Sequence, residues 1–227
     1  MVNRGRDRGC VDIFALVSPI TRRSVRVIPR RERKKTLASA VIAPDGVSVF
    51  EAFNSGECEI VASEEQAIVW ECQMDSPVAA AVFNGQGNLL ATRSQNGELR
   101  LWDVTTKAHL GTVSDVGQRR CGMAFSNDGE ELFFIGDDAS IKAYNIAADT
   151  TRDISALGGD DAWSIAASPT EQSLAVGGET AMSIVDVVGG KVVKRFEGHN
   201  GGIQWLAFSP NGELVSAASV DGLVKVW

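Results

Sequence analysis

Few residues in this chain could carry out chemistry. Its two histidines, His109 and His199, stand ninety positions apart, and the carboxylates are scattered, so no acid–base pair can be assigned from spacing. The sequence lacks the serine-hydrolase elbow, the phosphate-binding loop, the zinc-binding His-Glu-x-x-His pattern and the EF-hand loop. We therefore predict that the protein is not an enzyme and that it uses no cofactor and no metal.

The cysteines also argue against a bound metal. Cys10, Cys58, Cys72 and Cys121 form no Cys-x-x-Cys pair and have no histidine cluster beside them. This argues against a zinc site and against a dense disulfide framework. We expect reduced, partly buried thiols in an intracellular protein, because disulfides are rare in that compartment.

Charge divides the chain in two. The net charge of −7 is the sum of +8 over residues 1–36 and −15 over residues 37–227. We predict a basic, disordered arm over 1–36 attached to an acidic body. The arm's segment 29–35, Pro-Arg-Arg-Glu-Arg-Lys-Lys, resembles a nuclear localisation or nucleic-acid-binding patch. A solvated arm without such a role, or an organelle presequence, are the alternatives.

Apolar stretches are short. The longest near the start, Ile13 to Val17, cannot span a bilayer. We therefore predict no membrane partner and an intracellular location, cytoplasmic or nuclear, with organelle import left open.

A repeat of about forty-one residues organises the body. Gly-Glu-Leu-Arg-Leu-Trp-Asp at 97–103 recurs as Gly-Leu-Val-Lys-Val-Trp at 222–227. When the other segments are aligned with these two, one residue in each repeat falls at the tryptophan position, and we call this set the column. Its members are spaced by 41, 42, 41 and 42 residues: Val61, Trp102, Tyr144, Val185 and Trp227. Regular spacing of this kind indicates a repeat architecture.

Turn signals agree with the repeat. Upstream of each column residue, an apolar run ends in a polar turn, as in Ala-Val-Ile-Ala-Pro-Asp-Gly at 40–46. Residues 89–104 then show a second run, a second turn and a third run, and 108–115 supply a fourth. Short strands at this spacing predict an all-β fold. A four-stranded unit buries both faces only by stacking on neighbours, which predicts a β-propeller; a β-sandwich fits the strand lengths but not the period.

From residue 37 onward the chain resembles the WD-repeat family. The resemblance rests on Leu101-Trp102-Asp103, on Gly198-His199, and on the segment 206–227. It implies about five four-stranded blades in an incomplete ring. We place the repeats near 37–77, 78–119, 120–161, 162–202 and 203–227, the last incomplete. We expect either a fragment whose missing repeats follow Trp227 or a ring that a partner chain completes.

The resemblance also implies a hydrogen-bonded network inside each blade. In the last repeat it would consist of His199, Ser219, Asp221 and Trp227, and in the second, in part, of Ser94, Asn96 and Trp102. The other three repeats have Phe53, Gly136 and Gly177 at the serine position, so apolar packing must hold those blades. A Ser-His-Asp set could also imitate a hydrolase triad. We assign His199 the structural role, in which it satisfies buried polar groups.

Departures from the repeat mark a candidate partner surface. Trp205 replaces the small residues Ser39, Ala80, Gly122 and Ser164 of its column, and Arg93 stands in an otherwise apolar column. Trp and Arg are enriched at interface hot spots. The predicted surface comprises Trp163, Trp205, Arg93, Arg119 and Arg120. The alternative is that each Trp fills core volume and each Arg is solvated.

The function that these observations favour is a scaffold that binds other proteins or peptides in a multi-protein complex. The alternative is a nuclear ribonucleoprotein or chromatin-associated factor whose basic arm, 1–36, binds nucleic acid.

Overall fold

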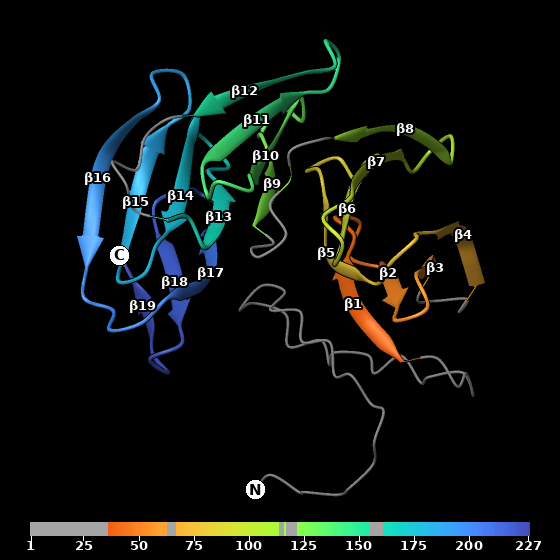
Figure 1. The fold of residues 1–227 in the computed structure, drawn as a ribbon, viewed down its shortest axis with the longest axis horizontal. Helices are drawn as coiled ribbons and strands as arrows, with labels where there is room; N and C mark the ends of the chain where they lie inside the picture. Colours follow the sequence, from red (N-terminus) through yellow and green to blue (C-terminus); the bar gives the residue numbers. More distant parts are fainter. Residues whose placement is uncertain (1–35, 63–66, 114–115, 117–121, 155–160) are drawn as a thin grey trace, which may run out of the picture.

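In a computed structural model, the described residues are 36–62, 67–113, 116, 122–154 and 161–227. They form nineteen strands and no helix. The strands make five antiparallel sheets that follow one another in chain order around a common axis (Figure 1). The predicted basic arm, except Thr36, lies outside the described residues, as do Arg119 and Arg120.

Each sheet is a meander in which every strand pairs with the next along the chain. We call the sheets blades 1 to 5, counted from the N-terminus. Blade 1 contains β1 (Leu37–Ile42), β2 (Ser48–Phe53), β3 (Glu57–Ala62) and β4 (Ala67–Gln73). Blade 2 contains β5 (Val78–Phe83), β6 (Leu89–Ser94), β7 (Leu99–Asp103) and β8 (Ala108–Val113). Blade 3 contains β9 (Met123–Phe125), β10 (Glu131–Ile135), β11 (Ile141–Asn145) and β12 (Thr150–Ile154). Blade 4 contains β13 (Ser164–Ala167), β14 (Ser173–Gly177), β15 (Ala181–Asp186) and β16 (Lys191–Glu197). Blade 5 has three described strands, β17 (Ile203–Phe208), β18 (Val215–Ser219) and β19 (Val224–Val226).

The turn after the first strand of a blade follows the predicted pattern. In four blades it closes on a glycine with positive φ: Gly46 (71°), Gly87 (74°), Gly129 (77°) and Gly212 (73°). The N–H of each donates to the carbonyl three residues earlier. In blade 4 the glycine is missing, and the Ser168 hydroxyl accepts the N–H groups of Thr170 and Glu171 instead, at 3.3 and 3.1 Å. A side chain thus does in one blade what a left-handed glycine does in the others.

The column that defined the repeat occupies matching sites. Val61, Trp102, Tyr144 and Val185 lie on the third strands of their blades, opposite Val49, Leu90, Leu132 and Leu174 on the second strands. Trp227 follows β19 and exchanges two backbone hydrogen bonds of 3.0 Å with Val215, its counterpart on β18. The register is therefore the same in all five blades, and the predicted repeat is confirmed.

The core lies between blades. Four apolar clusters fill the four seams between successive blades. Phe50, Leu90, Phe134 and Leu174, for example, are fully buried in them. Burying one such side chain contributes about 1.5–3 kcal/mol, so each blade depends on its neighbours for stability. The prediction of an all-β propeller is confirmed.

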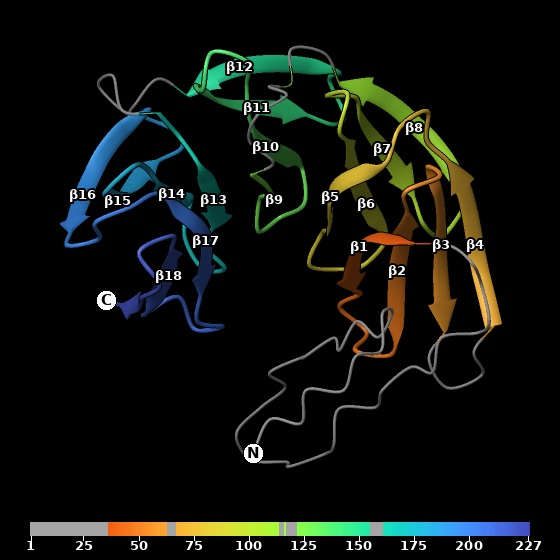
Figure 2. The same ribbon diagram turned by 60° about the horizontal axis from the view of Figure 1, so that its bottom comes forward.

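The five blades describe an arc. Figure 2 shows that the arc is open between blade 1 and blade 5.

Candidate functional site

Trp102 has hydrogen-bonded and aromatic contacts inside blade 2. Its indole N–H donates to the Thr92 hydroxyl at 2.8 Å, and that hydroxyl donates to the Met74 sulfur at 3.7 Å. The Trp102 ring meets Trp70 edge-on at 5.3 Å between centroids and His109 at 4.9 Å. Thr92 and Met74 are fully buried. The hydroxyl therefore satisfies an indole donor that would otherwise be buried without a partner.

This contact corrects the predicted role of Ser94. Trp102 lies opposite Leu90, so Thr92 is its diagonal neighbour, whereas Ser94 is two residues further along β6. The Ser94 hydroxyl donates instead to the Asn96 side chain and to the Glu98 carbonyl (3.1 Å). Ser94 and Asn96 therefore stabilise the turn after β6 and make no hydrogen bond with Trp102.

In blade 5, His199 and Asp221 lie together. His199 Nδ1 donates to Asp221 Oδ2 at 2.9 Å, and the His199 ring meets Trp227 edge-on at 5.8 Å. The Asn200 and Leu223 N–H groups also donate to the Asp221 carboxylate, both at 2.9 Å. The Asn200 N–H lowers the pKa of Asp221 most, and His199 and the Leu223 N–H lower it further. Asp221 is thereby held ionised and in place.

Ser219 does not complete a triad with these two residues. Its hydroxyl donates to the Gly201 carbonyl at 2.7 Å and accepts the Asp221 N–H at 3.2 Å. The buried His199 Nε2 has no hydrogen-bond partner among the described residues. A Ser-His-Asp relay needs a serine hydroxyl at that nitrogen, so the geometry assigns His199 to the interior of the blade.

Each of the two networks lacks a residue type that the other one has. Across the strands, Ala217 faces Lys225 as Thr92 faces Arg100, so Ala217 occupies the Thr92 position in blade 5. Met74 precedes β5 by four residues and His199 precedes β17 by four. Blade 2 thus combines tryptophan and hydroxyl with Met74, whereas blade 5 combines tryptophan, histidine and aspartate with Ala217.

The three predicted partner residues that the structure describes differ in exposure. Arg93 is fully buried between blades, because in a propeller its strand is covered on both faces, so its assignment to a surface is wrong. Trp163 is half-buried and lies against the Gly202 backbone, where a Cβ would come within 2.2 Å of the indole. Trp205 is 71% exposed. The remaining two arginines lie outside the described residues.

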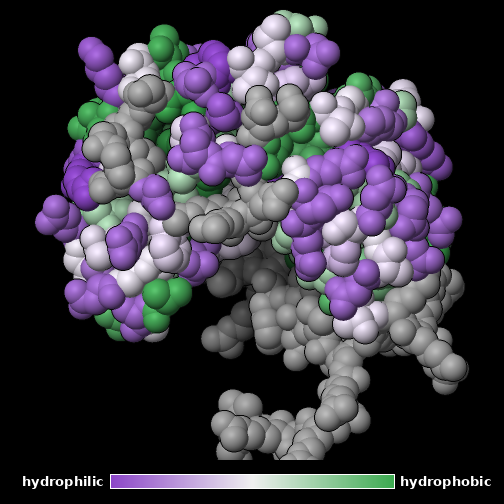
Figure 3. All heavy atoms as spheres, viewed as in Figure 1, coloured by the Kyte–Doolittle hydropathy of each residue, from purple (hydrophilic) through white to green (hydrophobic). Residues whose placement is uncertain are grey.

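Trp205 belongs to an exposed apolar face of blade 5. It lies opposite Ala218, which in turn lies opposite Val224, so the three share one face of the sheet. Val226 is on the same face two residues on, and Val224 and Val226 are 69% and 59% exposed. We call Trp205, Val224 and Val226 the fifth-blade face. In Figure 3, hydrophobic residues are visible over the lower part of this blade.

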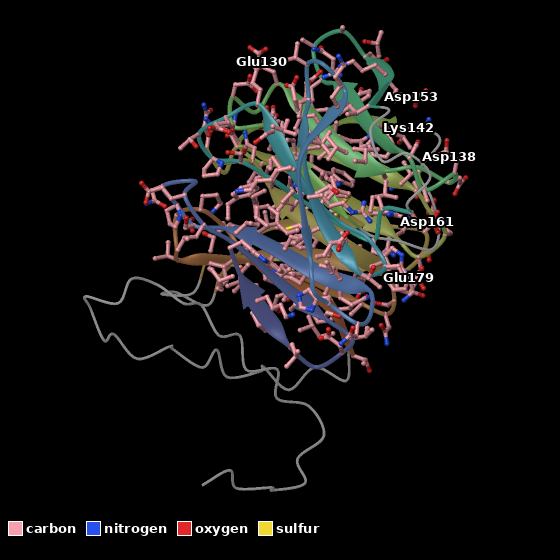
Figure 4. All side chains as sticks on the ribbon, turned by 90° about the vertical axis from the view of Figure 1, so that its left-hand side faces the viewer. Glu130, Asp138, Lys142, Asp153, Asp161 and Glu179 are labelled. Atoms are coloured by element: carbon pink, nitrogen blue, oxygen red, sulfur yellow. The ribbon has the colours of Figure 1, made fainter. Side chains whose placement is uncertain are left out.

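Acidic side chains line one side of blades 3 and 4. Figure 4 shows Asp138, Asp153, Asp161 and Glu179 on the same side of the molecule, while Glu130 lies on the other. We call these four residues the acidic rim. Lys142 lies among them and pairs with Asp153 at 2.8 Å. The Ser140 hydroxyl and N–H, which donate to the Asp138 carboxylate, lower the pKa of Asp138. Asp138 is therefore ionised at neutral pH.

The described part of the chain has neither a cluster of metal-binding side chains nor a membrane-spanning helix. It contains no group of three or more His, Cys, Asp or Glu residues that could hold a metal ion. It also contains no helix with the length and apolar character needed to cross a membrane.

Comparison with known proteins assigns the last repeat. Residues 190–227 match the family model described as "WD domain, G-beta repeat". The last blade is therefore similar to a WD repeat, and the chain as a whole has the β-propeller fold. It is similar in fold to the structures titled "Structure of U3-55K" and "Crystal structure of RRP9 WD40 repeats". Each superposes with a TM-score of 0.73 at 20% identity, over 87% of this chain and 62% and 61% of those chains.

Two curated relatives are longer than this chain. The mouse (Mus musculus) "U3 small nucleolar RNA-associated protein 18 homolog" is 23% identical over 115 residues, which is 50% of this chain and 21% of the relative. The "Nuclear distribution protein PAC1" of Coccidioides posadasii (strain C735) is 28% identical over 173 residues, 66% of this chain and 36% of the relative. The chain therefore spans well under half the length of either relative.

Three residues of the blade interiors were not predicted from the sequence. Thr92 is one of two hydroxyl residues on the same face of β6, and only cross-strand register separates it from Ser94. Met74 lies four residues before the start of β5, and that spacing could have identified it. His199, at the same distance from β17, was recognised from the glycine that precedes it. Trp70 lies on the outer strand β4, whose sequence has no motif, yet it packs between Phe50 and Trp102.

Proposed function

We propose that this WD-repeat chain is a non-catalytic scaffold that holds protein partners in a multi-protein complex. The observation that carries the proposal is which polar and apolar groups lie in the interior and which lie at the surface. The His199 and Thr92 networks are buried and serve the blades, whereas the fifth-blade face and the acidic rim are exposed on a rigid framework. Functions of this kind depend on surfaces that a stable scaffold presents.

The fifth-blade face offers the apolar contact. A contiguous exposed apolar patch on a soluble protein marks an interaction site more often than a scattered side chain does. Trp205 is large, rigid and mostly exposed, which suits a hot-spot residue that fills a partner's pocket. The acidic rim, on blades 3 and 4, would attract basic segments and speed association, with an effect that weakens as salt is added.

The full chain serves to test this proposal. We expect Trp205→Ala to reduce the set of proteins co-purified with the chain from cells, with no change in melting temperature because the indole is exposed. Val193→Ala is the matched control, since Val193 is 68% exposed on β16 of blade 4. Equal capture by Trp205→Ala and the unsubstituted chain would contradict a binding role for this face.

A nuclear RNA-associated complex is the second candidate. Both the mouse relative and one structural neighbour have names that refer to U3 RNA or its proteins. The net charge of +8 over residues 1–36, against −15 for the remainder, would let the arm bind phosphate while the body repels it.

Salt-dependent RNA binding tests this candidate. We expect the full chain to bind RNA with an affinity that falls steeply with salt, and a chain without residues 1–35 to lose that binding. The truncated chain should keep its protein partners. If truncation leaves RNA binding unchanged, the arm is not the RNA-binding element.

A further inference from the structure

Two cysteines face each other across blade 1. Cys58 on β3 and Cys72 on β4 are directly opposite in the antiparallel ladder. Side chains of directly opposite residues project from the same face of a sheet. Both thiols therefore lie in the seam between blades 1 and 2, Cys58 inside its apolar cluster and Cys72 packed against it.

Their backbone positions suit a covalent link. Met74 and Gly56 lie two residues further along the ladder from Cys72 and Cys58, and there the Met74 N–H donates to the Gly56 carbonyl at 2.8 Å. Because the pattern repeats every two residues, Cys58 and Cys72 also occupy a hydrogen-bonded pair, for which the Cα–Cα distance is about 5.5 Å. Disulfides join Cα atoms roughly 4.4–6.8 Å apart. The Cα separation of such a pair thus lies within the range that a disulfide joins, and closing the bond requires the two Cβ atoms to draw together.

The two thiols differ in their surroundings. Cys58 is 2% exposed and its Sγ donates to the Gly56 carbonyl at 3.4 Å, whereas Cys72 is half-buried. The hydrogen bond between the thiols, together with burial, raises the pKa of Cys72 above the usual thiol range. The Cys72 thiol therefore stays protonated at neutral pH, and Cys72 is the more exposed of the two residues.

We propose that Cys58 and Cys72 form a redox modification site that takes small disulfides, such as glutathione disulfide, and closes into a cross-strand disulfide. The Cys72 thiol loses its proton and attacks one sulfur of glutathione disulfide. A Cys72–glutathione mixed disulfide forms and one glutathione thiolate leaves. The Cys58 thiol then loses its proton and attacks the Cys72 sulfur, which expels the second glutathione. Two protein thiols are oxidised, and one glutathione disulfide is reduced to two glutathione thiols.

The product would join the outer strand β4 covalently to β3. Trp70 lies two residues before Cys72 on the same strand and packs against Trp102 of blade 2. Oxidation of the thiols therefore acts at the seam through which blade 1 is attached to the rest of the propeller.

The test uses the full chain with Cys10→Ser and Cys121→Ser, so that only the two facing thiols remain. The folded protein is incubated with glutathione disulfide and followed by intact mass and by alkylation of free thiols. We expect both thiols to disappear with the loss of two hydrogen atoms and no added glutathione. The rate should rise about tenfold per pH unit, because the thiolate is the attacking species.

Single variants in the same background fix the order of events. Cys58→Ser should stop at one glutathione adduct on Cys72, because the resolving thiol is missing. Cys72→Ser should stay unmodified, because Cys58 is buried. The proposal is overturned if the folded chain keeps both thiols while the chain in denaturant oxidises, or if Cys72→Ser gains glutathione as fast as Cys58→Ser.

Discussion

Thr92 accepts one hydrogen bond and donates another without contact with solvent. Thr92→Val keeps the shape of the side chain but removes the acceptor for the Trp102 indole N–H. Leaving that donor buried costs about 1–3 kcal/mol, so we expect a loss of that size in the free energy of unfolding. Urea denaturation measures it.

A double-mutant cycle isolates the contact. In a Trp102→Phe background there is no indole donor to satisfy, so Thr92→Val should cost much less. An equal cost in both backgrounds would show that the hydroxyl matters for some reason other than Trp102.

Ala217 leaves the blade 5 network one hydroxyl short. Ala217→Thr would place a hydroxyl near His199 Nε2, which has no hydrogen-bond partner among the described residues, as Thr92 is placed near Trp102 in blade 2. We expect Ala217→Thr to be more stable than Ala217→Val by about 1 kcal/mol in thermal or urea unfolding. Valine adds the same bulk without the hydroxyl, so any overpacking cancels in the comparison. Equal stability of the two variants would mean that the hydroxyl does not reach the imidazole.

Among the strands and turns, two glycines share one backbone conformation in different surroundings. Gly56 and Gly222 both have a φ of +82°. A Cβ at Gly56 would lie 2.2 Å from the Met74 carbonyl oxygen, whereas one at Gly222 meets nothing within 4 Å. Gly222→Ala should therefore cost only the left-handed strain, about 1–2 kcal/mol. Gly56→Ala should cost about 1–3 kcal/mol more, because the backbone at Met74 must also shift.

Urea denaturation of the two alanine variants gives this difference directly. Similar losses for both would show that the β4 end of blade 1 moves freely enough to absorb a methyl group.

The sequence predicts elements better than side-chain partners. The Trp102 column and the glycine turns fix the strands of blade 2, because alternation and turn chemistry are local properties. Thr92 and Ser94 both have a hydroxyl on the same face of β6, so only the pairing across strands decides which one meets the indole. Arg93 has the charge of a surface residue, and its burial comes from neighbouring blades that no local pattern describes.

For the whole molecule, acid should weaken the fold through its turns. Hydrogen bonds lower the pKa values of Asp103, Asp128, Asp138 and Asp221, chiefly those from the Thr106 N–H, the Ser126 hydroxyl, the Ser140 hydroxyl and the Asn200 N–H, respectively. An unfolded aspartate titrates near a pH of about 3.9. The native state therefore binds fewer protons than the unfolded state below that pH. Stability from these groups is complete above about pH 4 and is lost as the pH falls through the native values.

Urea midpoints at pH 7, 5, 4 and 3 would show the effect, with the main decrease below pH 4. Asp138→Asn keeps an oxygen that accepts the Ser140 hydrogen bonds but does not titrate. Its midpoint should decrease less between pH 4 and pH 3 than that of the unsubstituted chain. An equal decrease would show that Asp138 does not contribute to the loss of stability at low pH.

Because each apolar cluster joins only successive blades, cooperativity in this molecule is one-dimensional. In a linear array, the free energy of opening one unit depends on how many interfaces it shares. Blade 3 has a seam on each side, whereas blade 5 has one and leaves Trp205 exposed. Amide protons of β10 should therefore exchange with deuterium far more slowly than those of β18, although both are middle strands. The propeller would then open from its end blades, 1 and 5, inward, one interface at a time.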